Sequence, residues 1–189
     1  SIRRMANESN IYFAEQPVAP VDVQWLAEVR RSVPVPVMAD ESCYTLQDAM
    51  AVTKAGAADI LSIYVGKGGG IGPARKMAAV AEAAGLTCTP GVATPTEAFA
   101  ALAAGADALK LFPAEQLPPP VLKAWSSVLP KGTALLPVGG ITPDNMAPYR
   151  KAGAAGFGIG SALYAPGIDA AEVARRARAF VDGWNAANH

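Results

Sequence analysis

The sequence contains, at residues 137–143, the stretch Pro137-Val138-Gly139-Gly140-Ile141-Thr142-Pro143. An apolar segment leads into two glycines, and a threonine followed by a proline is a typical first turn of a helix. The stretch therefore predicts a strand that ends in a tight turn and opens a helix. The rest of the chain repeats this β-α unit on both sides.

Short apolar segments that are nearly continuous, as in parallel strands buried on both faces, predict the strands. They cover residues 11–14, 35–39, 60–65, 87–89, 108–112, 134–138 and 156–160. Alanine-rich amphipathic stretches between them predict helices over 21–31, 45–55, 73–84, 95–104, 119–128, 143–152 and 169–186.

Strict β-α alternation allows either a (β/α)8 barrel or a doubly wound sheet. No glycine-rich dinucleotide motif follows the first strand, which disfavours the doubly wound sheet. The seven candidate strands are one short of a closed barrel. We therefore predict an α/β fold of the TIM (β/α)8-barrel-like class, incomplete or chimeric, in a single domain over residues 1–189. A partner subunit or the first residues could supply the missing strand.

Composition excludes several classes of function. Among 189 residues, 16 Lys and Arg balance 16 Asp and Glu, so no basic excess indicates nucleic-acid binding. No apolar run reaches the roughly 20 residues of a membrane span, and the first residues do not resemble a secretory signal. Two cysteines favour a reducing cytoplasm. The only histidine is the terminal His189, which argues against Ser-His-acid triads, Cys-His pairs and histidine-bound zinc.

Lys110 lies in the middle of an apolar strand, between Leu109 and Leu111. A lysine at a sheet edge, with its stem on apolar surface and its ammonium in water, would explain this position. However, a central parallel strand has no face exposed to solvent. Desolvation of the lysine favours the neutral amine, which can form a Schiff base. Both interpretations are open from the residues alone.

Glycines stand at the ends of two consecutive predicted strands. Gly139 and Gly140 follow the first, and Gly158 and Gly160 lie in the last residues of the second. Such glycines let backbone N–H groups approach an anion at the start of a helix. Phosphate sites of (β/α)8 barrels lie after the last two strands, where these loops fall. Tight turns without a ligand would look the same.

From about residue 85 to 185 the sequence resembles the KDPG/KDPGal aldolase family, most closely its phosphogalactonate type. The resemblance is carried by residues 89–98, 108–113, 138–145 and 160–164, which occur in the order and spacing of the family. It implies that Lys110 is the Schiff-base lysine. It further implies that Gly139, Gly140, Gly160 and Ser161 hold the substrate phosphate, and that Pro90, Gly91 and Thr94 line the sugar-acid end.

Carboxylates end the first two predicted strands, with Glu15 after one and Asp40-Glu41 after the next. Oxygen ligands that converge at the mouth of a parallel barrel suit Mg²⁺, although helix capping by Asp40, Glu41 or Ser42 is an equal alternative.

Residues 2–86 resemble the mandelate racemase and muconate lactonising branch of the enolase superfamily. The resemblance is carried by Glu15-Gln16-Pro17, Ala39-Asp40-Glu41-Ser42, residues 63–70 and residues 72–76. It implies that Glu15 and Asp40 are two of three Mg²⁺ ligands, while the strand that bears the third is absent. Tyr64 stands near the position where some members carry a lysine base.

The chain thus resembles a hybrid, enolase-like over residues 1–86 and aldolase-like over 87–189. The function we expect is class I (Schiff-base) cleavage of a 2-keto-3-deoxy-6-phospho sugar acid, without a cofactor, with Glu15 as the acid/base opposite Lys110. The alternatives are an inactive chimeric scaffold and a Mg²⁺-dependent acid-sugar dehydratase. The expected partner is the small phosphorylated substrate, with neither nucleic acid nor membrane, and the aldolase resemblance implies a homotrimer.

Overall fold

The computed structural model describes residues 2–8 and 11–187, so His189 lies outside the described residues. It contains two compact units, which we call the N-terminal unit, residues 11–109, and the C-terminal unit, residues 110–187 with residues 3–8. That residues 1–189 act as a single domain stays a prediction. Within the described ranges, no helix combines the length and apolarity needed to cross a membrane.

The sheet of the N-terminal unit has four parallel strands in the order β1-β2-β3-β4. They are β1 (Ala14–Glu15), β2 (Val37–Ala39), β3 (Ile60–Leu61) and β4 (Thr87–Cys88). All three residues of β2 are buried, as its continuous apolar run predicts. Because the strands are parallel, the residues that follow them lie at one edge of the sheet.

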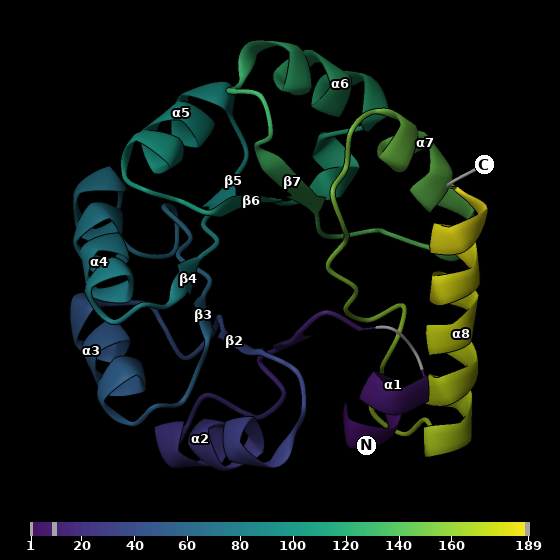
Figure 1. Ribbon diagram of the computed structural model, residues 1–189, viewed down its shortest axis with the longest axis horizontal. Helices are drawn as coiled ribbons and strands as arrows, with labels where there is room; N and C mark the ends of the chain where they lie inside the picture. Colours follow the sequence, from purple (N-terminus) through teal and green to yellow (C-terminus); the bar gives the residue numbers. More distant parts are fainter. Residues whose placement is uncertain (1, 9–10, 188–189) are drawn as a thin grey trace. The chain divides into compact units, whose positions relative to one another are not determined.

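Helices α2 (Val23–Ser32), α3 (Leu46–Lys54) and α4 (Ile71–Ala83) line one side of this sheet (Figure 1). The core lies between helices and strands and contains fully buried Leu26, Leu61 and Met77. Thr45 caps α3 in a capping box with Asp48, which confirms the predicted helix start.

A second sheet has the order β5-β6-β7. Its strands are β5 (Gly91–Val92), β6 (Ala108–Leu111) and β7 (Ala134–Pro137), and α5 (Pro95–Ala103) connects the first two. The boundary between the units falls inside β6, between Leu109 and Lys110.

The C-terminal unit is mostly helical. It contains η1 (Ala114–Gln116), α6 (Pro119–Val128), η2 (Pro143–Asn145), α7 (Met146–Lys151) and α8 (Ala170–Ala186), and most of α1 (Ile2–Glu8). Helix α8 packs on α7 and η2. Phe157 lies edge-on to Tyr149 and to Trp184, with ring centroids 6.3 and 5.8 Å away, and so joins α7 to α8.

The structure differs from the predicted elements at several places. Residues 156–160 form only one bridge, between Gly158 and Val138, instead of a strand. Glycine explains this difference, because it offers no side chain for the pleated surface. The predicted first strand is shifted to Ala14–Glu15, and β5 and α1 were not predicted.

Candidate functional site

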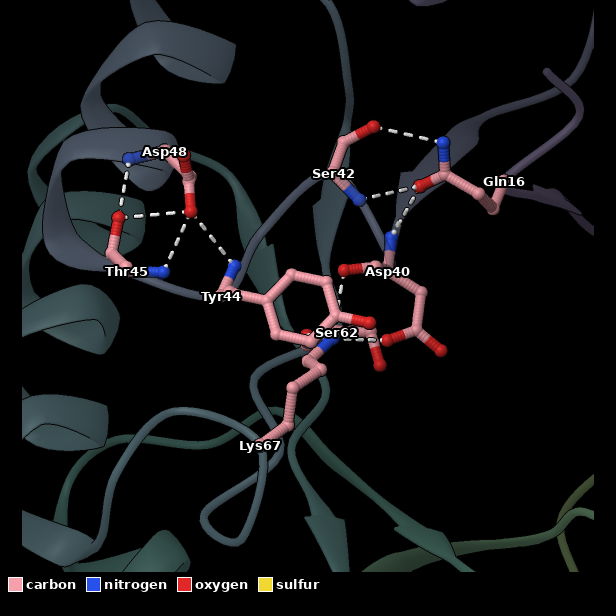
Figure 2. Close-up of polar contacts among 8 residues, drawn as sticks. All are labelled: Gln16, Asp40, Ser42, Tyr44, Thr45, Asp48, Ser62 and Lys67. Atoms are coloured by element: carbon pink, nitrogen blue, oxygen red, sulfur yellow. Dashed lines mark hydrogen bonds and ion pairs between the residues drawn. The ribbon is translucent and has the colours of Figure 1, made fainter. Parts of the chain in front are cut away.

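Polar side chains gather where the strands of the N-terminal unit end (Figure 2). Gln16 follows β1, Asp40 follows β2 and Ser62 follows β3. Parallel pairing brings these positions to the same edge, as the sequence predicts for Glu15 and Asp40. The residues between the strands and the following helices complete the cluster.

Gln16 joins the end of β1 to the turn after β2. Its Oε1 accepts hydrogen bonds from the backbone N–H groups of Asp40 and Ser42, both at 3.0 Å. Its Nε2 donates to Ser42 Oγ at 2.8 Å and to the Val18 carbonyl at 3.0 Å. The backbone of Gln16 has a φ of 38°, a conformation uncommon outside glycine. Sequence reasoning assigned no role to Gln16, although it stands directly after a strand and within the Glu15-Gln16-Pro17 motif.

Lys67 lies in the loop between β3 and α4 and points into the same cluster (Figure 2). Its Nζ donates to the Asp40 carbonyl at 2.7 Å, to the Ser62 carbonyl at 3.3 Å and to the Asp40 carboxylate. The ammonium also lies 5.1 Å from the centroid of the Tyr44 ring. The side chains of Lys67 and Asp40 are only 10% and 14% exposed. Sequence analysis placed Lys67 within the segment of residues 63–70 and gave it no partner.

These residues do not fit a magnesium site. Asp40, predicted as a ligand, directs its carboxylate to the Lys67 ammonium instead, and a fixed positive charge there opposes a second cation. Glu15 is half-buried at the end of β1. Across residues 2–8 and 11–187, no group of three His, Cys, Asp or Glu side chains is placed to hold a metal ion. The alternative prediction, that Asp40, Glu41 or Ser42 caps a helix, does not hold for α3, because its N-cap is Thr45.

Both cysteines are free and buried. Burial raises the pKa of Cys43 to about 11 and that of Cys88 to about 12. Both thiols are therefore protonated at neutral pH, and neither has the thiolate that a nucleophile or metal ligand requires.

The residues predicted to line the sugar-acid end surround β5. Pro90 and Gly91 are buried. A Cβ on Gly91 would lie 2.8 Å from the Tyr64 ring, so glycine allows this strand to approach Tyr64. Thr94 caps α5, and its hydroxyl accepts from the Glu97 N–H at 3.2 Å. Their contact with a substrate stays a prediction.

Lys110 is buried, at 9% exposure, in the middle of β6. Its neighbours Leu109 and Leu111 are fully buried, and its Nζ lies 5.7 Å from the centroid of the Phe112 ring. The interpretation of Lys110 as a solvated lysine at a sheet edge is therefore wrong. A buried lysine is a feature that Schiff-base chemistry uses.

The glycine loop after β7 has the predicted tight geometry. Gly139 and Gly140 have φ values of +99° and +62°. Asn145 fixes the loop, since its Nδ2 donates to the Gly140 carbonyl at 2.8 Å. Glu115 lies against both glycines, because a Cβ on Gly140 would be 2.7 Å from its Cγ and one on Gly139 would be 2.6 Å from its Oε2. Gly160 and Ser161 are exposed, and phosphate binding by these loops stays a prediction.

The family model of enolase C-terminal domain-like proteins matches residues 1–147. The chain belongs to this family. Muconate cycloisomerase 1 of Rhodococcus opacus is 44% identical to this enolase C-terminal domain-like chain over 81 residues, which are 43% of the chain and 22% of that protein.

The 2-dehydro-3-deoxy-6-phosphogalactonate aldolase of Escherichia coli (strain K12) is also similar. It is 48% identical over 103 residues, which are 54% of this chain and 50% of the aldolase. The solved native KDPGal structure has a TM-score of 0.77 and 31% identity, covering 93% of this chain and 82% of that one. Both predicted resemblances and the TIM-barrel-like α/β fold class are confirmed. The chain spans about half the length of its aldolase relative.

Proposed function

We propose that this enolase C-terminal domain-like chain is a class I (Schiff-base) aldolase-like lyase. Its substrate would be a 2-keto-3-deoxy-6-phospho sugar acid, and its products pyruvate and glyceraldehyde 3-phosphate. The observation that carries the proposal is the burial of Lys110 in the middle of β6. The 48% identity to an aldolase over about half the chain supports it.

In this reaction the neutral amine of Lys110 attacks the C2 ketone, and loss of water gives an iminium. A base removes the proton of the C4 hydroxyl, the C3–C4 bond breaks, and its electrons move to the iminium to form an enamine. Protonation at C3 and hydrolysis then release pyruvate and regenerate the amine.

Three further assignments belong to the proposal. Glu15 moves the protons. The Gly139-Gly140 loop, with Gly160 and Ser161, binds the phosphate through backbone N–H groups. The segment with Pro90, Gly91 and Thr94 contacts the sugar acid. No metal or organic cofactor enters this scheme, whereas the magnesium-dependent alternative needs a ligand set that the described residues do not assemble.

The test is reduction with borohydride in the presence of pyruvate, followed by peptide mapping. We expect the adduct on Lys110, and Lys110→Met should abolish both adduct and cleavage. Lys131→Met, at an exposed position before β7, is the matched control. A folded protein that takes up no label on Lys110 contradicts the proposal and favours the inactive scaffold.

The same experiment separates the role of Glu15. Glu15→Gln should keep adduct formation and lower the cleavage rate by roughly 10²–10⁴-fold, the usual contribution of a general acid/base.

We also propose a homotrimer, which light scattering would report as three times the 19.4 kDa of one chain. A cytoplasmic location stays part of the proposal.

A further inference from the structure

The environment of Lys67 has the composition of a cation-binding site. Two backbone carbonyls, from Asp40 and Ser62, and the Asp40 carboxylate accept hydrogen bonds from its Nζ. The face of the Tyr44 ring lies on the ammonium as well (Figure 2). Carbonyl oxygens, one carboxylate and an aromatic face together suit an organic ammonium ion better than a small, strongly hydrated metal ion.

A second observation concerns the Ser62 hydroxyl. Its Oγ is buried and has no hydrogen-bond partner among the described residues. This hydroxyl belongs to the same residue as the carbonyl that Lys67 contacts. It therefore offers one more oxygen to an ammonium ion bound at the site.

We propose that Lys67 is an internal cation which occupies an oxygen-lined ammonium site at the ends of β2 and β3 and excludes divalent metal ions from Asp40. The site thereby anchors the loop of residues 66–70 to the strand ends. This role is independent of the proposed lyase chemistry, because that chemistry assigns no part to Lys67, Asp40 or Ser62.

Removal of the side chain should create a vacant site for small ammonium ions. Lys67→Ala removes the cation that lies against the mostly buried Asp40 carboxylate, so Tm should fall by roughly 5 °C or more. Methylammonium or ethylammonium chloride should restore at least a third of this loss, while tetramethylammonium chloride and MgCl2 at equal ionic strength should not. Lys76→Ala, which removes an exposed lysine of α4, is the control and should change Tm little.

An unchanged Tm for Lys67→Ala, or a loss that MgCl2 restores as well as methylammonium does, overturns the proposal. Two measurements on the unaltered protein decide it even if this variant does not fold. Acetic anhydride should acetylate Lys67 at least tenfold more slowly than Lys76. Mn²⁺ should not bind at Asp40, so any signal from protein-bound Mn²⁺ should be the same in the unaltered protein and in Asp40→Asn. Equal acetylation rates of Lys67 and Lys76, or a Mn²⁺ signal that Asp40→Asn removes, would contradict the inference.

Discussion

Gln16 and Ser42 bind each other twice, since the Gln16 amide donates to the Ser42 hydroxyl at 2.8 Å and accepts from the Ser42 N–H at 3.0 Å. One side chain thus links the ends of two neighbouring strands. It also supplies an acceptor for the Asp40 N–H, and so positions the carboxylate that holds Lys67.

Gln16→Ala should therefore lower the free energy of unfolding by about 2–3 kcal/mol, because it removes several hydrogen bonds worth about 1 kcal/mol each and leaves partly buried N–H groups without their acceptor. Urea denaturation measures the change. Gln47→Ala, on the exposed side of α3, is the control and should lie within about 0.5 kcal/mol of the unaltered protein. Equal effects of the two substitutions would show that the amide does not hold the strand ends.

Arg30 and Asp59 form a second link, from α2 to the strands. Arg30 donates to Asp59 Oδ1 through Nε at 3.0 Å and Nη2 at 2.8 Å, and Asp59 Oδ2 accepts from the Val37 N–H at 2.9 Å. Burial would raise the pKa of Asp59, but these hydrogen bonds outweigh it and hold the pKa below the usual 3.8.

Because the pKa of Asp59 is lower in the folded than in the unfolded state, the pair stabilises the fold at pH values above the unfolded-state pKa. This contribution is lost as the pH falls through the folded-state pKa. Arg30→Met should cost about 1 kcal/mol at pH 7, a modest figure because both side chains are about one third exposed. In thermal unfolding measured across pH, the difference in stability between Arg30→Met and the unaltered protein should become smaller below pH 3.8. Arg31→Met, at an exposed neighbour, should show no such pH dependence.

Gly140 tests the proposed phosphate loop. Gly140→Ala places a methyl group against Glu115 in a left-handed backbone, whereas Gly132→Ala introduces comparable backbone strain, at φ +87°, with no atom within 4 Å. Both should cost about 1–2 kcal/mol of stability. Only Gly140→Ala should raise KM for the phosphorylated substrate, by about tenfold or more, with the pyruvate adduct on Lys110 retained. A similar change of KM in both variants would contradict the assignment of this loop to the phosphate site.

A narrow apolar crevice separates α4 from α5, with Ala74 and Ala78 on one side and Ala100 and Ala101 on the other. By resemblance, the two helices come from different families, and their small facing residues leave the interface underpacked. Ala100→Met should stabilise the fold by about 0.5–1 kcal/mol, because a flexible side chain fills the gap. Ala103→Met, on the exposed side of α5, should not, and differential scanning calorimetry compares them. A loss of stability with Ala100→Met would mean that the crevice cannot accept the side chain.

Local signals made much of the fold predictable. Continuous apolar runs located β2 and β6, and the threonine caps located α3 and α5 because hydroxyls pair with the first N–H groups of a helix. The glycine-rich segment 156–160 misled the prediction, since strand pairing depends on side chains that glycine lacks.

The candidate site was less predictable, because its contacts join residues far apart in the chain. The apolar neighbours of Lys110 left open whether its side chain is buried or solvated, and the structure shows that it is buried. In contrast, the pairing of Asp40 with Lys67 depends on how the loop after β3 folds back, and a pattern of carboxylates at strand ends indicated a metal instead. Gln16 belongs to the Glu15-Gln16-Pro17 motif, but that motif did not indicate which groups its amide binds.

The unit boundary inside β6 affects how the chain can be divided into fragments. The two resemblances meet near Gly85, yet β4, β5 and α5, which follow that point, pack in the N-terminal unit. A fragment that ends where the two resemblances meet would lack β4, β5 and α5, whereas one that ends after Leu109 would keep them but would divide β6. The boundary between the two resemblances and the boundary between the two compact units thus fall at different places in this polypeptide.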